Sequence, residues 1–270
     1  MIAYLQYPEW LRPEIIPGFP VRWYGLMYLV AFVIAYFLLR HQMAERGIPN
    51  PNDEAMNLIT WGIIGLLLGA RIFATIVYDN TVWYLTHPWL IFWPFDSHMH
   101  FTGFQGMSFH GGVIGGALGV LFYSIKHKQS FWSNADMMVT AIPFGYSFGR
   151  IGNFINAELY GRVTDSPIGM IFPGQNQPRH PSQLYEAFFE GFVLGILMWF
   201  VFRKMKLKDG VRVGLYLFCY GLIRFFIEYF REPDADLGFV LLNFTMGQVL
   251  CLLMMLFGGL FIIIRSRKTT

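Results

Sequence analysis

The sequence has few charged residues: they make up 14% of its 270 residues, while hydrophobic residues make up 55%. An ordinary soluble domain carries about 25% charged residues. The shortage of charge extends along the whole chain rather than over one segment, which argues against a soluble fold. It predicts instead a single polytopic membrane domain that covers residues 1–270.

Cysteine is also scarce, and lysine is missing from the amino-terminal stretch. The two cysteines, Cys219 and Cys251, both lie in apolar runs, where a thiol usually behaves as a small buried hydrophobe. They indicate neither a disulfide nor a reactive thiol. Because residues 1–20 contain prolines and no lysine, they lack the pattern of a cleaved signal peptide, and we expect the first span to act as its own insertion signal. The net charge of +3 is too small and too scattered to indicate a nucleic-acid partner.

Seven apolar runs have about the 20 residues that a helix needs to cross a bilayer. Glycine dominates the third run, and small residues spaced along a helix let a neighbouring helix approach closely in lipid. No internal repeat relates the two halves of the chain, which speaks against many secondary transporters. The sequence therefore predicts an all-α, polytopic membrane protein with seven transmembrane helices. The runs lie near residues 21–40, 57–78, 103–124, 131–151, 183–202, 211–230 and 244–264.

The basic residues are distributed unevenly between the two sides of the predicted bundle. Lysine and arginine in short connections favour the cytoplasm. They are concentrated after the first, third, fifth and seventh runs, whereas the opposite side holds only Arg12, Arg162, Arg179 and Arg231, with Arg22 at its border. This predicts an amino terminus outside, a carboxyl terminus in the cytoplasm, and a small periplasmic arm or head at residues 152–182. The residues on the cytoplasmic side are Arg40, Arg46, Lys126, Lys128, Arg203, Lys204, Lys206, Lys208, Arg212, Arg265, Arg267 and Lys268.

Apart from the arginines assigned to the cytoplasmic side, four lie within or at the edge of apolar runs: Arg22, Arg71, Arg150 and Arg224. An arginine in the middle of a span costs about 2.5 to 3.5 kcal/mol on insertion scales, so its presence calls for a partner or a function. Arg224 shares a helical face with Glu228, four residues on, which fits either a stabilising ion pair or a functional one. Arg71 has no such neighbour, so that interfacial snorkelling or a hydrogen bond between helices would have to satisfy it.

The stretch GRIGNFINAELYGR, residues 149–162, places a dense polar group at the end of the fourth run. Arg150 is followed by Asn153, Asn156 and Glu158, and helical spacing carries the glycines and amides along adjacent turns. A guanidinium offers a planar fork of donors that suits a lipid phosphate, and amides would help to orient it. The alternative is a helix terminus that is tied to the following loop.

Histidine in general titrates near neutrality and is uncommon in lipid, so His110, in GMSFHGG, is either a proton acceptor or a histidine hydrogen-bonded across a helix interface. Ser182 is the predicted N-cap of the fifth span, and Glu186 and Glu190 are expected to hold arginines from other spans. His98 and His100 have no nearby cysteine or carboxylate cluster, so we expect no metal site there. No phosphate-binding glycine loop, zinc-protease helix or serine nucleophile elbow indicates a cofactor or a nucleophile.

Five motifs follow one another along these runs: WYGLMY, MSFHGG, GRIGNFINAELYGR, RHPSQLYE and RFFIEYFREPDA. In this order, and with seven apolar runs between and around them, the chain resembles the bacterial prolipoprotein diacylglyceryl transferase family over essentially its whole length. The resemblance implies a transferase of the bacterial inner membrane with its active site toward the periplasmic leaflet. Such an enzyme moves the sn-1,2-diacylglyceryl group of phosphatidylglycerol to the lipobox cysteine thiol of a prolipoprotein signal peptide and releases glycerol phosphate, without a metal or cofactor.

The resemblance also implies roles for particular residues. Carried onto this chain, the family's essential residues are Tyr24, His110, Arg150, Asn153, Gly161 and Arg224, with Glu158 and Glu228 in support. We predict that Tyr24, His110, Arg150 and Arg224 are catalytic, with His110 as base. The residues predicted to bind phosphatidylglycerol are Arg150, Asn153, Asn156, Glu158, Gly161, Glu228 and Arg231.

Two other classes of protein would use the same residues differently. A transporter or channel for an anionic solute would line its pathway with the arginines, although most polar residues here cluster toward the outer half of the predicted bundle. A structural membrane scaffold would pair the arginines with Glu186, Glu190 and Glu228 and have no substrate.

Overall fold

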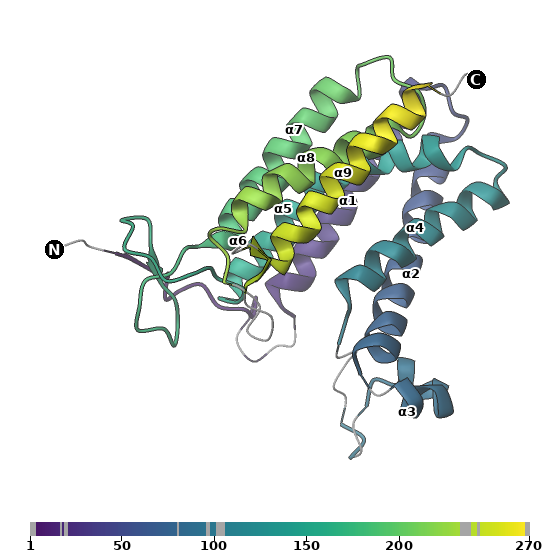
Figure 1. Ribbon diagram of the computed structural model, residues 1–270. Helices are drawn as coiled ribbons and strands as arrows, with labels where there is room; N and C mark the ends of the chain where they lie inside the picture. The colour runs from purple at the N-terminus through teal and green to yellow at the C-terminus, as the bar shows by residue number, and fades with distance from the viewer. Residues whose placement is uncertain are drawn as a thin grey trace. The chain divides into compact units, whose positions relative to one another are not determined.

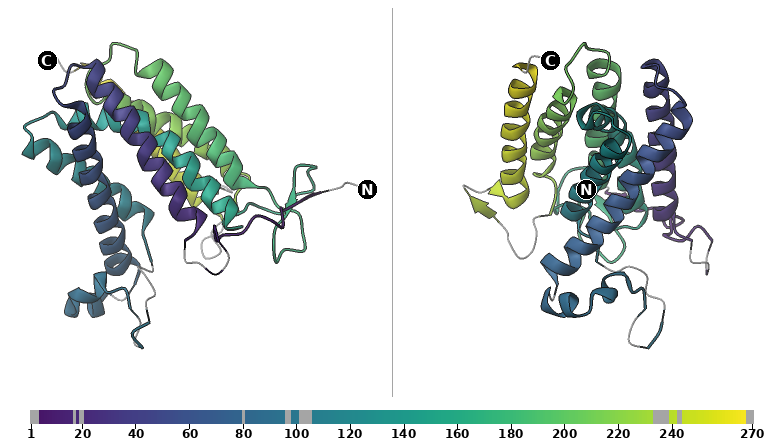
Figure 2. Two further views of the ribbon diagram at one scale, coloured as in Figure 1. Left: turned by 180° about the vertical axis from the view of Figure 1, so that it is seen from behind. Right: turned by 90° about the vertical axis from the view of Figure 1, so that its right-hand side faces the viewer.

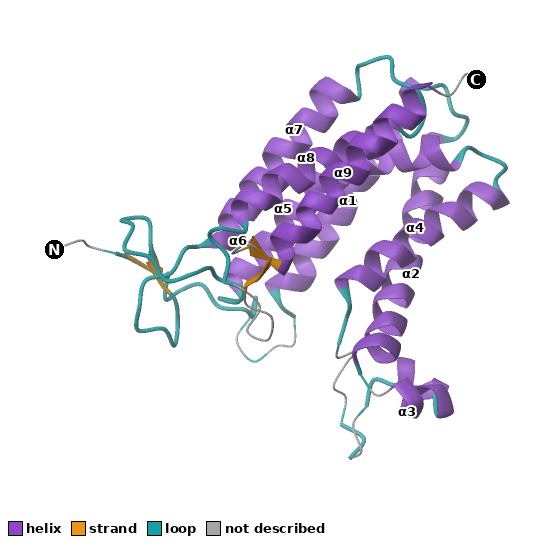
Figure 3. Ribbon diagram, in the orientation of Figure 1, coloured by secondary structure: helices purple, strands orange, loops and turns teal. Residues whose placement is uncertain are grey.

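The computed structural model describes residues 4–16, 18, 21–79, 81–95, 98–100, 106–232, 239–241 and 244–267. Within these residues the structure is mainly helical, with two short two-stranded sheets (Figure 3). The chain divides into two compact units. The first unit comprises Met1–Leu39 and Asp136–Thr270, and the second comprises Arg40–Ala135.

The first unit is a bundle in which helices distant in sequence lie side by side (Figures 1 and 2). Small residues set its close contacts: a Cβ on Gly145 would lie 3.2 Å from the Cβ of Ala31, and a Cβ on Gly191 would lie 1.8 Å from the Oγ of Ser147. The bundle contains α1 (Trp23–Glu45), α5 (Phe131–Ile155), a continuous helical run formed by α6 (Ser182–Tyr185), η3 (Glu186–Val193), α7 (Leu194–Ile196) and η4 (Leu197–Phe202), then α8 (Val211–Ile227) and α9 (Met246–Arg267). The first residues of α5 and the last of α1 belong to the second unit.

The second unit is built on two long helices that pack against each other, α2 (Pro51–Phe73) and α4 (Phe109–Lys126). The π-helical turn η1 (Ala74–Tyr78) continues α2. The short helices α3 (Thr81–Thr86) and η2 (Pro88–Phe92) follow it.

A helix covers each of the seven apolar runs, with some differences at the boundaries. Residues 103–105 of the third run lie outside the described residues, and its helix begins at Phe109. The helix of the fourth run does not end at 151 but continues to Ile155. Among the described residues, four helices are long and apolar enough to cross a membrane: Trp23–Glu45, Pro51–Tyr78, Ser182–Phe202 and Met246–Arg267. The crossing of the other three remains a prediction.

Glycines allow α2 and α4 to come into backbone contact. A Cβ on Gly115 would lie 2.1 Å from the carbonyl oxygen of Gly65, and a Cβ on Gly119 would lie 2.1 Å from that of Trp61. Neither position has room for a larger residue unless the helices separate. The close approach expected from the glycines of the third run is therefore confirmed.

Replacing Gly115 with alanine should destabilise the protein by about 1–3 kcal/mol, because the new methyl group overlaps backbone rather than a side chain that can move. Gly116→Ala is the matched control, because a Cβ there would lie 3.8 Å from the Gly62 carbonyl oxygen, an ordinary contact. Thermal unfolding in detergent micelles should give a clearly lower Tm for Gly115→Ala than for Gly116→Ala. Equal Tm values would contradict this packing.

A small layer of chain lies beyond the carboxyl end of α5. Strand β1 (Leu5–Gln6) pairs in parallel with β2 (Met170–Ile171), and Tyr7, Met170 and Phe172 form a buried cluster beside the pair. The Tyr7 hydroxyl donates to the carbonyl oxygen of Ile155 at 2.9 Å, which ties this layer to α5. The layer corresponds to the predicted arm at 152–182, except that residues 152–155 belong to the helix.

Candidate functional site

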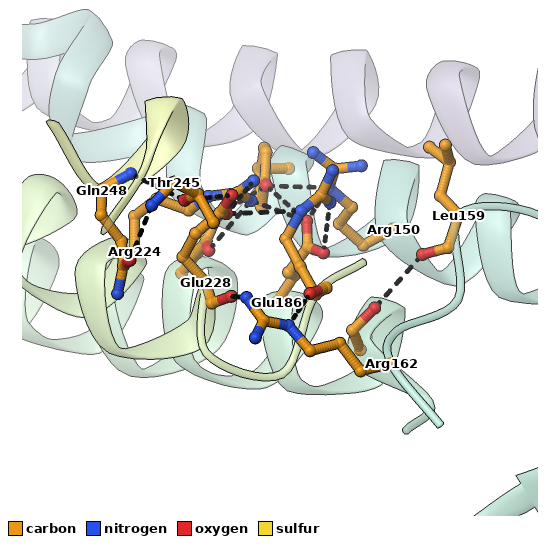
Figure 4. A network of polar contacts seen from close by, with 12 residues as sticks. Arg150, Leu159, Arg162, Glu186, Arg224, Glu228, Thr245 and Gln248 are labelled. Carbon is orange, nitrogen blue, oxygen red and sulfur yellow. Dashed lines mark hydrogen bonds and ion pairs between the residues drawn. The ribbon is translucent and has the colours of Figure 1, made fainter. Parts of the chain in front are cut away.

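The centre of the site is the carboxylate of Glu186, whose side chain is 0% exposed. Its Oε2 lies 2.8 Å from the Nε of Arg150 and 3.1 Å from the Nη1 of Arg224, and its Oε1 lies 2.8 Å from the Nη1 of Arg231. Three guanidiniums, contributed by α5, by α8 and by the segment after α8, thus meet one buried carboxylate. Figure 4 shows Arg150, Arg224 and Glu186 in this cluster. We call Arg150, Arg224, Arg231, Glu186, Glu190 and Glu228 the arginine–glutamate network.

Local helix geometry explains why the carboxylates converge. Glu186 and Glu190 lie four residues apart on the helical segment η3, so that both side chains lie on the same face. The Oε1 of Glu190 lies 3.4 Å from the Nη1 of Arg224, and the Oε2 of Glu228 lies 3.0 Å from its Nη2. Both predictions are confirmed: Arg224 pairs with Glu228 on one helical face, and Glu186 and Glu190 hold arginines from other helices.

The pairing also shows that none of the three arginines is buried without a partner. Burying a charge is costly unless an opposite charge accompanies it, and here each guanidinium has a carboxylate partner. The side chains of Arg150, Arg224 and Arg231 remain only 18%, 15% and 19% exposed. The arginines are therefore held in fixed orientations by the bundle, an arrangement that the scaffold alternative also predicts.

Arg150 occupies the last turns of α5 with its donors pointing in different directions. Its Nε–H donates to the Tyr146 hydroxyl at 2.8 Å, and its Nη1 donates to the Oδ1 of Asn153 at 3.3 Å. Among the described residues, its Nη2 makes no hydrogen bond of its own. Because the Nε–H and one hydrogen of Nη1 hold the internal partners, the donors that remain on Arg150 belong to its terminal amino groups.

Asn153, Asn156 and Glu158 form one hydrogen-bonded group beside Arg150. The Nδ2 atoms of Asn153 and Asn156 donate to the Oε1 of Glu158 at 2.8 Å and 3.2 Å. The prediction that helical spacing carries both amides along adjacent turns is wrong for Asn156, because α5 ends at Ile155 and Asn156 lies in the turn after it. The ring of Tyr24 packs against Gly152, where a Cβ would lie 2.9 Å from its Cδ2, so Tyr24 borders the same stretch.

Gly161 connects this stretch to the end of α8. A Cβ on Gly161 would lie 2.1 Å from the carbonyl oxygen of Phe230, so only glycine permits the contact. Its N–H donates to the carbonyl oxygen of His180 at 2.8 Å. Next to it, the Nε of Arg162 donates to the carbonyl oxygen of Arg231 at 2.6 Å. These contacts give Gly161 a packing role, and its contact with a substrate remains a prediction.

Ser182 is not the N-cap that the sequence predicts. It is the first residue of α6, the capping position belongs to Pro181, and no side chain caps the helix. The Ser182 hydroxyl instead donates to the carbonyl oxygen of Leu159 at 3.2 Å. It therefore fixes the loop that carries Glu158 rather than the start of the helix.

The second unit holds His110 and Arg71. The exposed ring of His110 makes a hydrogen bond of 2.9 Å between its Nδ1 and the hydroxyl of Tyr78, which belongs to η1. This bears out the hydrogen-bonded alternative, while a role as base remains a prediction. Arg71 is buried, and it donates from Nε to the carbonyl oxygen of Ile91 and from Nη1 to that of Gly106 at 3.3 Å. Snorkelling therefore does not account for Arg71.

Arg22 lies outside the helices, because α1 begins at Trp23, and it is exposed. It therefore does not belong with the other three arginines that were predicted to be embedded in spans. Its backbone forms an antiparallel bridge with Glu14.

Sequence reasoning missed two parts of the site. Tyr146 lies one helical turn before Arg150, and that spacing was the available signal. On the other side of the network, the Thr245 hydroxyl donates to the Oε1 of Glu228 at 3.2 Å. A Cβ on Gly247 would lie 2.4 Å from the same oxygen, so a glycine at the start of α9 leaves room for the carboxylate. No spacing in the sequence indicated this second contact.

Comparison with known proteins identifies similar chains. A family model described as prolipoprotein diacylglyceryl transferase matches residues 13–264. The phosphatidylglycerol–prolipoprotein diacylglyceryl transferase of Treponema denticola is 48% identical, with 95% of this chain and 93% of the relative covered. Relatives with the same name from Chlorobaculum tepidum and Treponema pallidum are 47% and 45% identical, covering 97% and 94% of this chain and 92% and 94% of their own lengths. Every residue of the arginine–glutamate network falls inside the matched region.

Proposed function

Because this chain belongs to the prolipoprotein diacylglyceryl transferase family, we propose that it transfers the diacylglyceryl group of phosphatidylglycerol to a prolipoprotein, the first step of lipoprotein maturation. The acceptor is the thiol of the lipobox cysteine, and glycerol phosphate is the leaving group. The observation that carries the proposal for the site is the convergence of three oriented guanidiniums on Glu186, inside the region that the family model matches.

The pairing of the arginines with carboxylates supports a phosphate site whose donors are oriented before the ligand binds. A guanidinium has five N–H donors in a rigid fork, and a carboxylate on one side leaves the donors of the other side for a ligand. Donors that are already oriented need no reorganisation when charge develops on the substrate. Arg150 presents its terminal amino groups in this way, with Asn153 and Glu158 beside them. The network is therefore suited to receive the phosphate of a lipid headgroup.

The reaction replaces a C–O bond of the glyceryl group with a C–S bond. The sulfur of the lipobox cysteine attacks the glyceryl carbon next to the phosphate, a C–S bond forms, and the C–O bond to the phosphate breaks with its electron pair leaving on oxygen. A cysteine thiol has a pKa of about 8.5, so a base or a positive field must increase the thiolate fraction. His110 is proposed to accept the thiol proton, and Arg150 and Arg224 are proposed to stabilise the charge on the departing phosphate. Tyr24, Asn153, Asn156, Glu158, Gly161, Glu228 and Arg231 complete the proposed site.

The proposed setting is the bacterial inner membrane. The chain crosses it seven times, with the amino terminus outside and the site toward the periplasmic leaflet, where phosphatidylglycerol and the exported signal peptide are both present. The four long apolar helices and the uneven distribution of basic residues support this arrangement.

The direct test uses the purified protein in liposomes that contain phosphatidylglycerol, together with a peptide that carries a lipobox cysteine. Mass spectrometry should find the peptide heavier by one diacylglyceryl group, with glycerol phosphate released. A peptide with alanine in place of the cysteine, and liposomes without phosphatidylglycerol, should give no product. An unmodified cysteine peptide, combined with flux of an entrapped anion, would instead favour the transporter alternative.

A further inference from the structure

The hydroxyl of Tyr146 stands between a carboxylate and the guanidinium of Arg150. It lies 2.6 Å from the Oε2 of Glu190 and 3.3 Å from the Oε2 of Glu186, and it accepts the Nε–H of Arg150 at 2.8 Å. The Cζ of Arg150 also lies 4.9 Å from the centroid of the Tyr146 ring, a cation–π contact. One side chain thus contacts the guanidinium both at its Nε, through the hydroxyl, and at its Cζ, through the ring.

Chemistry fixes the direction of these hydrogen bonds. A charged guanidinium has no acceptor and an ionised carboxylate has no proton to donate, so the Tyr146 hydroxyl must accept from Arg150 and donate to Glu190. A hydroxyl that donates to a carboxylate becomes a stronger acceptor, because chains of hydrogen bonds polarise one another. The order Glu190, Tyr146, Arg150 is therefore a directed chain that ends on the guanidinium.

The ion pair between Arg150 and Glu186 does not by itself orient the guanidinium. The Nε atom lies 2.8 Å from a Glu186 oxygen, yet the N–H bond has hydrogen-bonding geometry toward the Tyr146 oxygen. An ion pair without a directed hydrogen bond permits rotation of the planar fork, whereas the hydrogen bond to the Tyr146 hydroxyl, with the ring beside the guanidinium, restricts that rotation. Tyr146 therefore determines which way the terminal amino groups of Arg150 face.

We infer that Tyr146, oriented by Glu190, is a positioning residue for Arg150, which presents the terminal amino groups of that arginine to the lipid phosphate. The inference rests on the proposed function, because it needs Arg150 to bind phosphate. It predicts that a change at Tyr146 alters kcat/KM for phosphatidylglycerol and leaves KM for the lipobox peptide unchanged.

The test is Tyr146→Phe, which removes the hydroxyl and keeps the ring. The full-length protein is assayed in mixed micelles, with the mole fraction of phosphatidylglycerol and the peptide concentration varied separately. We expect kcat/KM for phosphatidylglycerol to fall by roughly tenfold, because one hydrogen bond to a charged group is lost, while KM for the peptide stays unchanged. Tyr220→Phe is the matched control: the ring of Tyr220 meets that of Tyr146 with centroids 6.2 Å apart, and within the part of the chain that the structure describes its hydroxyl makes no hydrogen bond to Arg150.

The outcomes separate this inference from the proposed function. If Arg150→Ala is inactive and Tyr146→Phe behaves like the unaltered protein, the positioning role is overturned and the phosphate site stands. If Arg150→Ala keeps normal turnover, the phosphate site itself fails. Equal losses in Tyr146→Phe and Tyr220→Phe, or a rise in KM for the peptide as well, would mark a general structural effect and also overturn the inference.

A second variant covers the case in which Tyr146→Phe does not fold. Glu190→Gln keeps an oxygen that accepts the Tyr146 hydroxyl and removes the charge that polarises it. We expect a smaller fall, about threefold, in kcat/KM for phosphatidylglycerol, with KM for the peptide again unchanged. An unaltered value for phosphatidylglycerol would contradict the directed chain.

Discussion

Arg150→Ala should lower diacylglyceryl transfer by at least about a hundredfold, the size of effect seen when one preorganised donor to a developing charge is removed. The alanine takes away the terminal amino groups proposed to bind the phosphate, and it also takes away one of the three guanidiniums around Glu186. The measurement is the initial rate of peptide modification in proteoliposomes of fixed phosphatidylglycerol content. The loss should appear mainly in kcat, because charge on the departing oxygen is greatest in the transition state.

Two further variants show whether the loss of activity in Arg150→Ala comes from the lost charge or from the lost geometry of the guanidinium. Arg150→Lys keeps the positive charge near Glu186 but replaces the planar fork with a single ammonium, so it should preserve most of the stability and little of the activity. Arg22→Ala removes an exposed arginine that precedes α1, and it should leave the rate unchanged. Full activity in Arg150→Ala would refute the phosphate role of this residue.

Part of the site can be predicted from the sequence, because helical spacing depends only on residues that are close together in the chain. Arg224 and Glu228 are four residues apart, and the structure pairs them at 3.0 Å. The apolar runs likewise coincide with helices because a long run of apolar residues has few other stable conformations in lipid. The glycines of the third run indicated close packing for the same kind of reason, since their lack of side chains is visible in the sequence.

Contacts between segments that lie far apart in the chain are harder to predict from the sequence. That Arg150 and Arg231 share the carboxylate of Glu186 depends on how α5, η3 and the end of α8 pack, and no spacing along the chain encodes it. The π-helical geometry of η3 is not visible as a pattern either, because its residues would be equally suitable in an α-helix. The pairing of β1 with β2 joins segments that lie far apart in the chain, residues 5–6 and 170–171, each of which is too short for a strand signal.

Glu186→Gln should have the largest effect on stability of any single change in the network. The substitution keeps the shape of the side chain but leaves three guanidiniums around a neutral amide, and removing one partner from buried ion pairs typically costs about 3–5 kcal/mol. Thermal unfolding in detergent micelles should show a much lower Tm. Glu232→Gln is the matched control, because Glu232 is 54% exposed where it pairs with Arg179, and surface pairs contribute at most about 1 kcal/mol.

The same variant distinguishes a phosphate site from a structural scaffold. A ligand that binds the folded state raises the Tm, so micelles containing phosphatidylglycerol should stabilise the unaltered protein more than micelles containing phosphatidylcholine. In Glu186→Gln the difference should grow, because an anionic phosphate then supplies part of the charge that the carboxylate no longer provides. If the two lipids give equal Tm values in both proteins, the guanidiniums do not meet a lipid phosphate, and the network is a scaffold that serves only to hold the bundle together.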